Sequence, residues 1–557
     1  MSGSQNWQET FDVLVVGSGS AALCAALRAS AGGLSCKILE KTALIGGTSA
    51  MSGAGTWIPA NYHAAAAGLK DSVDEALTYL RAASPSGWQE TEDDLWASFA
   101  RAAPRALAFI ETATHLRFAL TQEPDTMPER AGGKLRGRML SPKPLSKWIV
   151  GSFAGKIRPS TLPHLFTYQE VYDGDLYHRP VRATLRVIHR LIWRVVSRSR
   201  AQGSALVTGL LKGCLDNGCS ISTNARVVEL IKDDETGQIV GLVADMNGAR
   251  TRLRANVGVV IASGGFEWNR EMLNDYFPGQ LDWLGSPRGN EGDGQRMVSN
   301  VGGALAHMDQ ANVYPAIPTR YEGNLHGLPM IFQAEKHAIV VDRSGKRFAS
   351  EYDFNIGVAV DQRDGKTGQP EHLPAWLIAD SRLLKNAPTL GWYSRKDPKW
   401  MVRASTLREL ATKIGVPANA LAETVARFNG FCADGRDPDF HRGESAWEQF
   451  KAGGLNSAMG PIDRPPYLAA PFNRSILGTK GGARTNNLGQ VVRADGGVIP
   501  GLYAAGLSMA NPIGTLAVGP GTTIGPNLTW GFICGEALLS EKVARHEQSA
   551  LSSMRTG

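Results

Sequence analysis

The sequence predicts an α/β fold, in which a Rossmann-like, mainly parallel sheet carries a second, α+β domain as an insertion. Three observations indicate this fold. An apolar, β-branched run at residues 11–16 leads through a glycine motif into a helical segment and a second strand. Another apolar strand, residues 257–266, also ends in glycines, and a glycine-rich turn at residues 519–526 precedes the last helix. With 557 residues, the chain is long enough for two or more domains.

The glycine motif after the first strand has the spacing G-x-G-x-x-A, with Gly17, Gly19 and Ala22 at the fixed positions. The first glycine allows a tight turn, the second lets a pyrophosphate approach the backbone, and the small third residue lets helix and strand pack closely. The second strand ends at Glu40, 23 residues after Gly17, where a carboxylate accepts a hydrogen bond from a ribose hydroxyl. This arrangement predicts a dinucleotide with its phosphates at the helix N-terminus. The alternative is a tight turn in an ordinary α/β domain.

The segment at residues 46–55 is small and rich in hydroxyl groups, so it suits the ribityl chain and edge of a flavin. Glu40-Lys41, followed by residues 45–49, resembles the large flavoprotein family of fumarate reductases, succinate dehydrogenases and 3-ketosteroid dehydrogenases. The resemblance implies that the dinucleotide is FAD. No pattern in the sequence indicates covalent attachment, so we expect FAD to bind non-covalently.

The composition is that of a globular protein. Apolar residues make up 43% of the chain and charged residues 20%, and no window holds 18 uninterrupted apolar residues. The polar start of the chain lacks the basic and apolar regions of a signal peptide. The six cysteines are scattered without metal-binding spacing. We therefore expect a cytoplasmic protein with reduced thiols and no metal site.

Positive charge is concentrated in residues 131–200, which contain 14 Lys and Arg but only three acids. Within this part, residues 141–200 are predicted to form a basic amphipathic insertion, because arginines recur every four residues from 182 to 198 beside apolar residues. Two interpretations remain open. The helix packs on the body with a solvated basic edge, or residues 145–200 make a peripheral contact with an anionic membrane. Nucleic acid is not expected as a partner, because no aromatic stacking platform accompanies the arginines.

The order of the motifs predicts a discontinuous first domain. Residues 1–295 and 461–557 are assigned to the FAD-binding domain, and residues 296–460 to an inserted substrate and catalytic domain, with the active site between them. Apolar residues recur at helical spacing in residues 71–120 and 407–429, so both segments are predicted to be helical.

The turn at residues 519–526 leads into a helix that is predicted to start at Asn527. Backbone N–H groups at the start of this helix would stabilise negative charge at the pyrimidine end of the flavin. The alternative is a glycine turn that only caps the helix. The residues predicted to bind FAD are Gly17, Gly19, Ser20, Ala21, Glu40, Lys41, Gly46, Gly47, Thr48, Ser49, Ser52, Gly53, Val227, Ala262, Ser263, Gly264, Gly506, Gly521, Thr522, Thr523 and Ile524.

Further motifs narrow the resemblance to 3-ketosteroid Δ1-dehydrogenase. They are residues 47–59, 345–348, 477–482 and 519–526. The resemblance implies that an apolar cyclic ketone loses a proton from Cα and a hydride from Cβ, and that the hydride passes to flavin N5. The protein must then polarise the carbonyl and place a base. In the steroid enzymes tyrosines do this together with one glycine N–H, and Gly521 matches that glycine.

The tyrosines of the steroid enzymes are not matched in this sequence. Thr126, Asn355 and Ala517 stand at or near their positions. Fumarate reduction is also not expected, because Asn355 stands where those enzymes carry an arginine, and Thr479-Lys480 where they carry a histidine. The chemistry must therefore come from other side chains.

The first substitute is Tyr352, which lies three residues from Asn355, and Tyr314 and Tyr321 follow. Two histidines are further candidates for the base, namely His326 and His337. For each of these side chains a packing role is the alternative. The predicted catalytic set is Tyr352, Asn355, Gly521 and Tyr314.

The leading hypothesis is α,β-dehydrogenation of an apolar cyclic ketone, with a steroid-like substrate and an electron acceptor that the sequence leaves unidentified. The second hypothesis is the reverse reaction, an ene-reductase of an activated alkene. The third is a flavin-binding protein whose missing tyrosines mark lost or altered catalysis.

Overall fold

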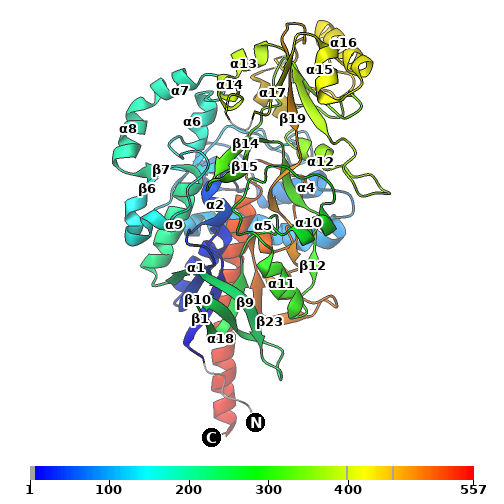
Figure 1. Cartoon of the computed structure of the whole chain (residues 1–557). Helices are drawn as coiled ribbons and strands as arrows, with labels where there is room; N and C mark the ends of the chain where they lie inside the picture. The colour runs from blue at the N-terminus through cyan, green and yellow to red at the C-terminus, as the bar shows by residue number, and fades with distance from the viewer. Residues whose placement is uncertain (1–6, 247, 397–398, 455–456, 557) are drawn as a thin grey trace.

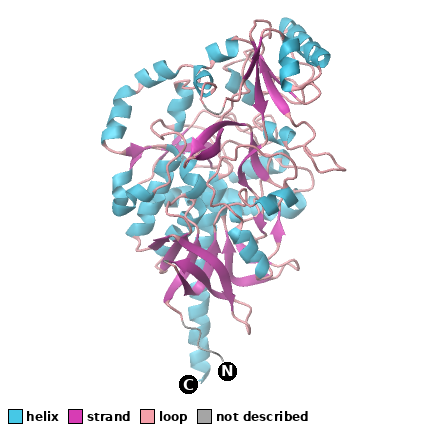
Figure 2. Ribbon diagram, in the orientation of Figure 1, coloured by secondary structure: helices cyan, strands magenta, loops and turns pink. Residues whose placement is uncertain are grey.

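The structure, a computed structural model, describes residues 7–556 except 247, 397–398 and 455–456. A large sheet with helices on its faces forms the lower part of Figure 1, and a smaller antiparallel sheet lies in the upper part. Figure 2 shows these strands at two levels, joined by a middle region of loops and short elements. Both termini lie at the lower end of the molecule.

The large sheet has the strand order β22-β23-β11-β1-β2-β8, and the pairings from β23 to β8 are all parallel. Its strands are β1 (Glu9–Val16), β2 (Cys36–Glu40), β8 (Ser220–Thr223), β11 (Ala249–Ile261), β22 (Gln490–Val492) and β23 (Val498–Ala504). β9 (Ala225–Lys232) and β10 (Ile239–Met246) continue from β11 as antiparallel strands. Strands from the start, middle and end of the chain thus share one sheet, and the predicted α/β class with a mainly parallel sheet is confirmed.

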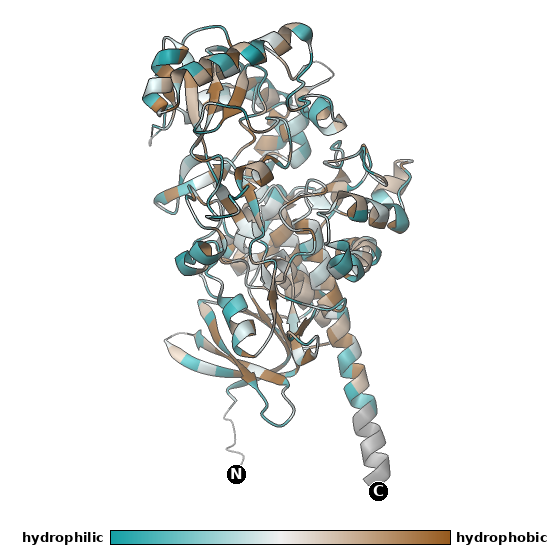
Figure 3. Cartoon of the chain, turned by 90° about the vertical axis from the view of Figure 1, so that its right-hand side faces the viewer, coloured by the Kyte–Doolittle hydropathy of each residue, from teal (hydrophilic) through white to brown (hydrophobic). Residues whose placement is uncertain are grey.

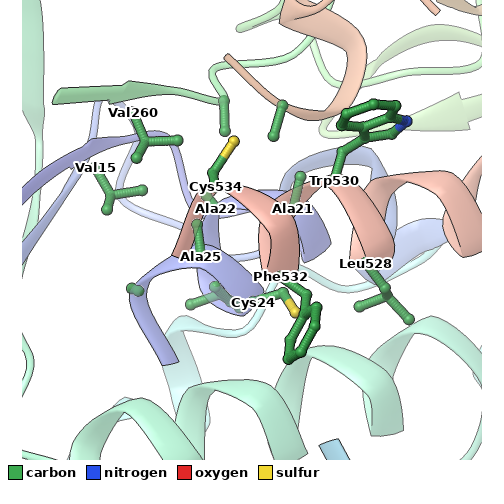
Figure 4. Packing of buried hydrophobic residues seen from close by; sticks show 14 of the residues in the cluster. Val15, Ala21, Ala22, Cys24, Ala25, Val260, Leu528, Trp530, Phe532 and Cys534 are labelled. Atoms are coloured by element: carbon green, nitrogen blue, oxygen red, sulfur yellow. The ribbon is translucent and has the colours of Figure 1, made fainter. Parts of the chain in front are cut away.

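Helix α1 (Ser20–Ala31) is covered by α18 (Ile524–Thr556) and by α9 (Gln202–Asp216). Small residues permit the close contact, since a Cβ on Gly531 would lie 2.4 Å from the Ala21 carbonyl oxygen. Figure 4 shows Cys24 and Ala25 of α1 among side chains of α18, including Phe532. In Figure 3, α18 is apolar where it crosses the body and more polar where it emerges. This packing fixes α18, which follows the C-terminal glycine turn, against α1, which follows the N-terminal glycine turn.

The upper sheet is antiparallel and has the order β16-β17-β19-β18. Its strands are β16 (Ala338–Val341), β17 (Ala375–Ala379), β18 (Val402–Ala404) and β19 (Tyr467–Phe472). Because β19 belongs to this sheet, the chain returns to the large sheet later than the predicted boundary at residue 461. The segment predicted to be helical at residues 407–429 is divided into α15 (Leu407–Ile414) and α16 (Ala418–Asp434), because Gly415 (φ +74°) ends the first helix and Pro417 precedes the second.

The remaining helices and strands lie between and around the two sheets. The helices are α2 (Gly47–Met51), α3 (Tyr62–Ala66), α4 (Val73–Ala83), α5 (Gln89–Ala113), α10 (Arg270–Tyr276), α11 (Asp293–Asn300), α12 (Ile356–Val360), α13 (Arg382–Asn386), α14 (Pro388–Tyr393), α17 (Ala446–Ala452) and the 3₁₀ helix η2 (Gly506–Ser508). The strands are β3 (Thr56–Trp57), β4 (Phe118–Leu120), β5 (Met139–Pro142), β12 (Leu305–Ala306), β13 (Ala311–Tyr314), β14 (Ala316–Tyr321), β15 (Asn324–Pro329), β20 (Ser475–Thr479) and β21 (Gly482–Ala483). The segment at residues 71–120, predicted to be helical throughout, thus forms α4 and α5 and ends in β4.

The predicted basic insertion does not form one continuous helix. It contains β6 (Leu145–Ser146), the 3₁₀ helix η1 (Lys147–Lys156), α6 (Tyr168–Asp173), α7 (Pro180–Arg186), α8 (Ile188–Val196) and β7 (Ser199–Arg200). Val187 has φ −122° and ψ 15°, so the backbone leaves the helical conformation between α7 and α8. Arg194 points inward and is buried, whereas most other arginines of the row are exposed. Among the described residues, no helix is long and apolar enough to cross a membrane.

Candidate active site

A cavity of about 1100 Å³ lies at the carboxyl ends of the parallel strands β1, β2 and β11. Open α/β sheets bind their ligands at this edge. Residues of β13, β15 and α6 border the cavity on its other side. Every residue predicted to bind FAD borders it except Gly46. The volume is large enough for a dinucleotide and a further small molecule, because drug-sized ligands need about 300–1000 Å³.

The N-terminus of α1 fits a diphosphate. Gly19 is the N-cap of the helix and provides no side-chain cap. The Ser20 N–H donates to Ser49 Oγ at 3.1 Å, and the N–H groups that follow it in the first turn can face a ligand. A Cβ on Gly17 would lie 2.3 Å from the Ala262 carbonyl oxygen, and its φ of +106° is also strained for any other residue. At Gly19 a Cβ would meet only Ser49 Oγ, at 3.6 Å. Gly17 therefore makes the turn possible, and Gly19 keeps the cavity side open.

Glu40 lies at the end of β2, where a ribose hydroxyl is expected. Its Oε2 accepts a hydrogen bond from Ser18 Oγ (2.5 Å), and its Oε1 accepts one from the Thr42 N–H (2.8 Å). A carboxylate has further lone pairs, so it can still accept a bond from a ligand. Gly46 contributes indirectly, because its N–H donates to Ser18 Oγ at 2.9 Å.

Lys41, the next residue, does not present a free ammonium to the cavity. Its Nζ lies 2.9 Å from Glu291 Oε2 and 2.7 Å from Asp293 Oδ2. Lys41 thus fastens the end of β2 to the start of α11.

The opposite end of the cofactor region is formed by the turn before α18. A Cβ on Gly521 would lie 2.5 Å from the Gly55 carbonyl carbon, and φ at Gly521 is +86°. Thr523 Oγ1 accepts a hydrogen bond from Asn312 Nδ2 of β13 at 2.8 Å. The helix starts at Ile524, three residues earlier than predicted. Gly521 thus holds its backbone against the segment at residues 55–57 and borders the cavity.

The three positions that lack the expected tyrosines lie close together and support the backbone. Asn355 Nδ2 donates to the Ala517 carbonyl (3.0 Å), and the Ala517 N–H donates to Asn355 Oδ1 (2.8 Å). Thr126 Oγ1 donates to the same carbonyl at 2.6 Å. Asn355 and Thr126 therefore hold the loop segment that leads into Gly521, and neither side chain borders the cavity.

Tyr352 also lies away from the cavity. It is buried, packs against Ala334 and Ala458, and has the Arg442 guanidinium 4.9 Å from its ring centre. Burial raises its pKa to about 12, although Arg442 opposes the shift. These contacts are those of a packing tyrosine.

The remaining candidates named from the sequence do not border the cavity either. Tyr321 donates to the Pro159 carbonyl at 2.9 Å, and His337 Nδ1 lies 2.7 Å from the Pro461 carbonyl. Burial lowers the pKa of His326 to about 4.

Tyr314 does border the cavity. In β13, Ala311 and Val313 are buried, whereas Asn312 and Tyr314 share the opposite face of the strand. Since Asn312 contacts Thr523, Tyr314 lies on the same wall as the Gly521 turn. Burial raises the pKa of Tyr314, so its hydroxyl keeps its proton near neutral pH.

Two further tyrosines, which the sequence analysis did not single out, lie in the cavity wall. Tyr168 and Tyr172 are on α6, and their hydroxyl oxygens are 3.2 Å apart. A Cβ on Gly53 would lie 3.2 Å from the ring of Tyr168, so this ring lies against the predicted FAD segment. Burial raises the pKa of Tyr168 well above its usual value. Their spacing of four residues places both tyrosines on one face of a helix. Only the arginines of this insertion were considered in the sequence analysis, so these tyrosines were not selected.

A buried carboxyl and a buried ammonium accompany these phenols. Glu123 borders the cavity, and burial raises its pKa. Glu123 Oε1 has no hydrogen-bond partner among the described residues. Lys451 Nζ lies 5.3 Å from the ring centre of Tyr172, and burial lowers its pKa. The cavity thus contains a proton acceptor and several phenol donors.

Comparisons with known proteins agree with this geometry. A family model described as FAD binding domain matches residues 12–524. A 4-oxocyclohexanecarboxylate 2-dehydrogenase of Sinomonas cyclohexanicum is 32% identical over 562 residues, which cover 98% of this chain and 96% of that protein. A 3-oxosteroid 1-dehydrogenase of Mycolicibacterium smegmatis is 34% identical, with 94% of this chain and 96% of that protein covered.

Among solved structures, the 3-ketosteroid Δ1-dehydrogenase of Sterolibacterium denitrificans in complex with 1,4-androstadiene-3,17-dione is similar over the whole chain. It has 30% identity and a TM-score of 0.87, and the match covers 96% of this chain and 100% of that one. The resemblance inferred from the motifs is therefore confirmed.

Proposed function

We propose that this chain, which belongs to the FAD binding domain family, oxidises an apolar ring ketone. The chain is an FAD-dependent oxidoreductase that acts on CH–CH groups, and the proposal proceeds from that activity. The new double bond forms between the carbons α and β to the carbonyl. Two relatives with different substrates support the choice, because the names 4-oxocyclohexanecarboxylate and 3-oxosteroid both describe a ketone on a six-membered ring. The largely apolar far wall, which includes Leu176, Phe354 and Phe450, suits the rest of such a ring system.

The observation that carries this proposal is that Gly521 and four tyrosines border one cavity beside the predicted FAD segment. The tyrosines are Tyr168, Tyr172, Tyr177 and Tyr314. FAD, when bound, accepts the hydride that leaves Cβ. Gly521 presents its backbone at the start of α18, where partial positive charge favours an oxygen that becomes negative. Tyr314 lies on the same wall, and its protonated hydroxyl serves as a second donor to the substrate carbonyl.

Tyr168 is assigned to the proton at Cα. Its ring lies against Gly53, its hydroxyl is hydrogen-bonded to Tyr172, and Glu123 lies beside it. A phenol alone is a weak base near neutral pH. A carboxylate with a free oxygen supplies the acceptor to which Tyr168 passes the proton, and the raised pKa of Glu123 brings it closer to the operating pH. Tyr168 and Glu123 thus take the proton-transfer role for which Tyr352 and Asn355 were predicted, whereas Gly521 and Tyr314 of the predicted set keep a role at the carbonyl.

One observation favours the reverse reaction as a second candidate. Burial raises the pKa of all four cavity phenols, and protonated phenols are suited to donate a proton to Cα of an enone. An ene-reductase would use the same residues in the opposite direction.

Anaerobic mixing with substituted cyclohexanones and 3-ketosteroids tests the proposal. A saturated ring ketone should bleach the visible flavin band within the turnover time and leave an enone. Bleaching only by an external reductant, followed by reoxidation with an enone, would show the reductase direction instead. A protein that retains FAD and responds to neither class of compound would contradict both proposals.

A further inference from the structure

An unusual apolar surface covers the outside of α7 and α8, which form the outer edge on the left of Figure 1. Large apolar side chains are exposed there, and Trp193 and Val196 keep 68% and 72% of their surface. The α7–α8 surface consists of Val181, Leu185, Ile188, Ile192, Trp193, Val195 and Val196. Large contiguous apolar patches on a protein surface mark interaction sites, because water contact is unfavourable for them.

Cations lie among these apolar side chains. Arg182, Arg186, Arg190 and Arg198 are exposed on or next to the same two helices. Arg198 lies 4.7 Å above the ring of Trp148, which is itself 58% exposed and extends the apolar area. An amphipathic helix that lies in a membrane interface has this combination of apolar and basic side chains.

From this combination we propose that the α7–α8 surface docks on an anionic lipid surface, with both helices lying in the interface plane. The charge argues against a second copy of the chain. In a two-fold symmetric contact the same patch meets itself, so the exposed arginines would face one another. Anionic headgroups instead attract each Lys or Arg near the membrane surface.

The same insertion forms part of the cavity wall. Arg194 of α8 points inward and pairs with Glu170 of α6, with Nη1–Oε2 at 2.5 Å and Nη2–Oε1 at 2.9 Å. Tyr168 and Tyr172 of α6 border the cavity, as do most residues from 160 to 178. Arg190 of α8 also pairs with Glu170, with Nη1–Oε1 at 3.3 Å, so two ion pairs join the docking helix to the cavity wall. If the substrate is the apolar ketone of the proposed function, on which this step rests, it reaches the cavity from the lipid.

Sedimentation with vesicles tests the docking surface on the full-length holoprotein. Wild type should sediment with vesicles of equal parts phosphatidylcholine and phosphatidylglycerol, and much less with pure phosphatidylcholine. The triple variants Arg182→Glu/Arg186→Glu/Arg198→Glu and Ile192→Ser/Trp193→Ser/Val196→Ser should each lower the partition coefficient at least about tenfold. The matched control Arg254→Glu/Arg403→Glu/Arg408→Glu changes exposed arginines elsewhere and should bind as wild type does.

Two results would overturn the docking proposal. One is wild type that stays in the supernatant with anionic vesicles at low salt. The other is a dimer at micromolar concentration that the serine variant dissociates, because a second copy would then cover the surface. Flavin bleaching by a water-soluble ring ketone separates membrane docking from the proposed function. The variants leave the cavity residues unchanged, so their flavin should be bleached at the wild-type rate. A protein that binds vesicles but gives no bleaching contradicts the proposed function alone.

Turnover of an apolar ketone dissolved in the vesicles tests the access route. Anionic vesicles should raise the rate for wild type severalfold over the arginine variant, while both proteins oxidise the water-soluble ketone equally. Equal rates with the vesicle-dissolved ketone would contradict access from the lipid.

Discussion

The two sides of the cavity are built in different ways. The cofactor side, residues 17–53 and 506–524, presents mainly backbone and glycines whose positive φ or close neighbours exclude a side chain. The substrate side, residues 121–123, 168–178 and 312–314, presents side chains from segments far apart in the sequence. Backbone recognition constrains the residue type at each position, whereas a phenol can reach the same point from another element. Local motifs therefore determine the residues of the cofactor side. On the substrate side, the same chemical group can be supplied by residues of different elements.

The largest effect is expected on the cofactor side. Gly521→Ala places a Cβ against the Gly55 backbone at 2.5 Å and in a left-handed conformation. We expect purified protein with little FAD, and dehydrogenation lowered about 1000-fold. Flavin absorbance per protein and single-turnover rates measure both. Gly496→Ala is the control, because Gly496 has a similar φ of +82° and no neighbour within 4 Å, so it should keep its FAD.

On the substrate side, Tyr168→Phe should leave the FAD content unchanged and lower kcat by about 100-fold, because it removes a hydroxyl that moves a proton. Tyr352→Phe is the matched control and should keep most of its activity, since Tyr352 lies outside the cavity. The opposite pattern, with an active Tyr168→Phe and an inactive Tyr352→Phe, would return the catalytic role to Tyr352.

The pH dependence tests the role of Glu123. If Glu123 accepts the proton, kcat/KM falls as pH decreases through its pKa, and burial places that pKa above the ordinary value of about 4.3 for glutamate. Glu123→Gln should remove this acidic limb and lower the rate at neutral pH. A wild-type kcat/KM that keeps rising with pH beyond about pH 9 would instead indicate a base of higher pKa, namely a tyrosinate.

The smallest effect on kcat is expected at Asn355, which borders neither side of the cavity and supports the Ala517 backbone. Asn355→Ala loses two hydrogen bonds to Ala517, so the free energy of unfolding should fall by about 1–3 kcal/mol and kcat only modestly. Urea unfolding and steady-state rates give both quantities, and Asn355→Asp should recover part of the stability because it keeps the acceptor. Unchanged stability with a loss of kcat as large as that of Tyr168→Phe would place Asn355 at the substrate.

Sequence reasoning was most reliable where chain neighbours make the site. Gly17, Gly19 and Glu40 fall within one βαβ unit, and their spacing is set by strand and helix geometry. It was least reliable in the basic insertion. There the repeat of arginines predicted one helix, but the backbone breaks at Val187 and Arg194 turns inward to Glu170. An ion pair between segments that are 24 residues apart leaves no periodic signal in the sequence.

The sequence by itself determined the parallel sheet and a bound dinucleotide, because glycine turns, apolar strands and the first acid act through local geometry. FAD as the cofactor and the type of reaction followed from the resemblance of its motifs to 3-ketosteroid Δ1-dehydrogenase. Only the tertiary structure decided which phenols reach the cavity. It placed Tyr168, Tyr172 and Tyr314 in the wall, and it assigned Asn355 and Thr126 to supporting the Ala517 backbone. The physical reason is that proton transfer needs groups within hydrogen-bond reach, and packing of distant segments sets those distances.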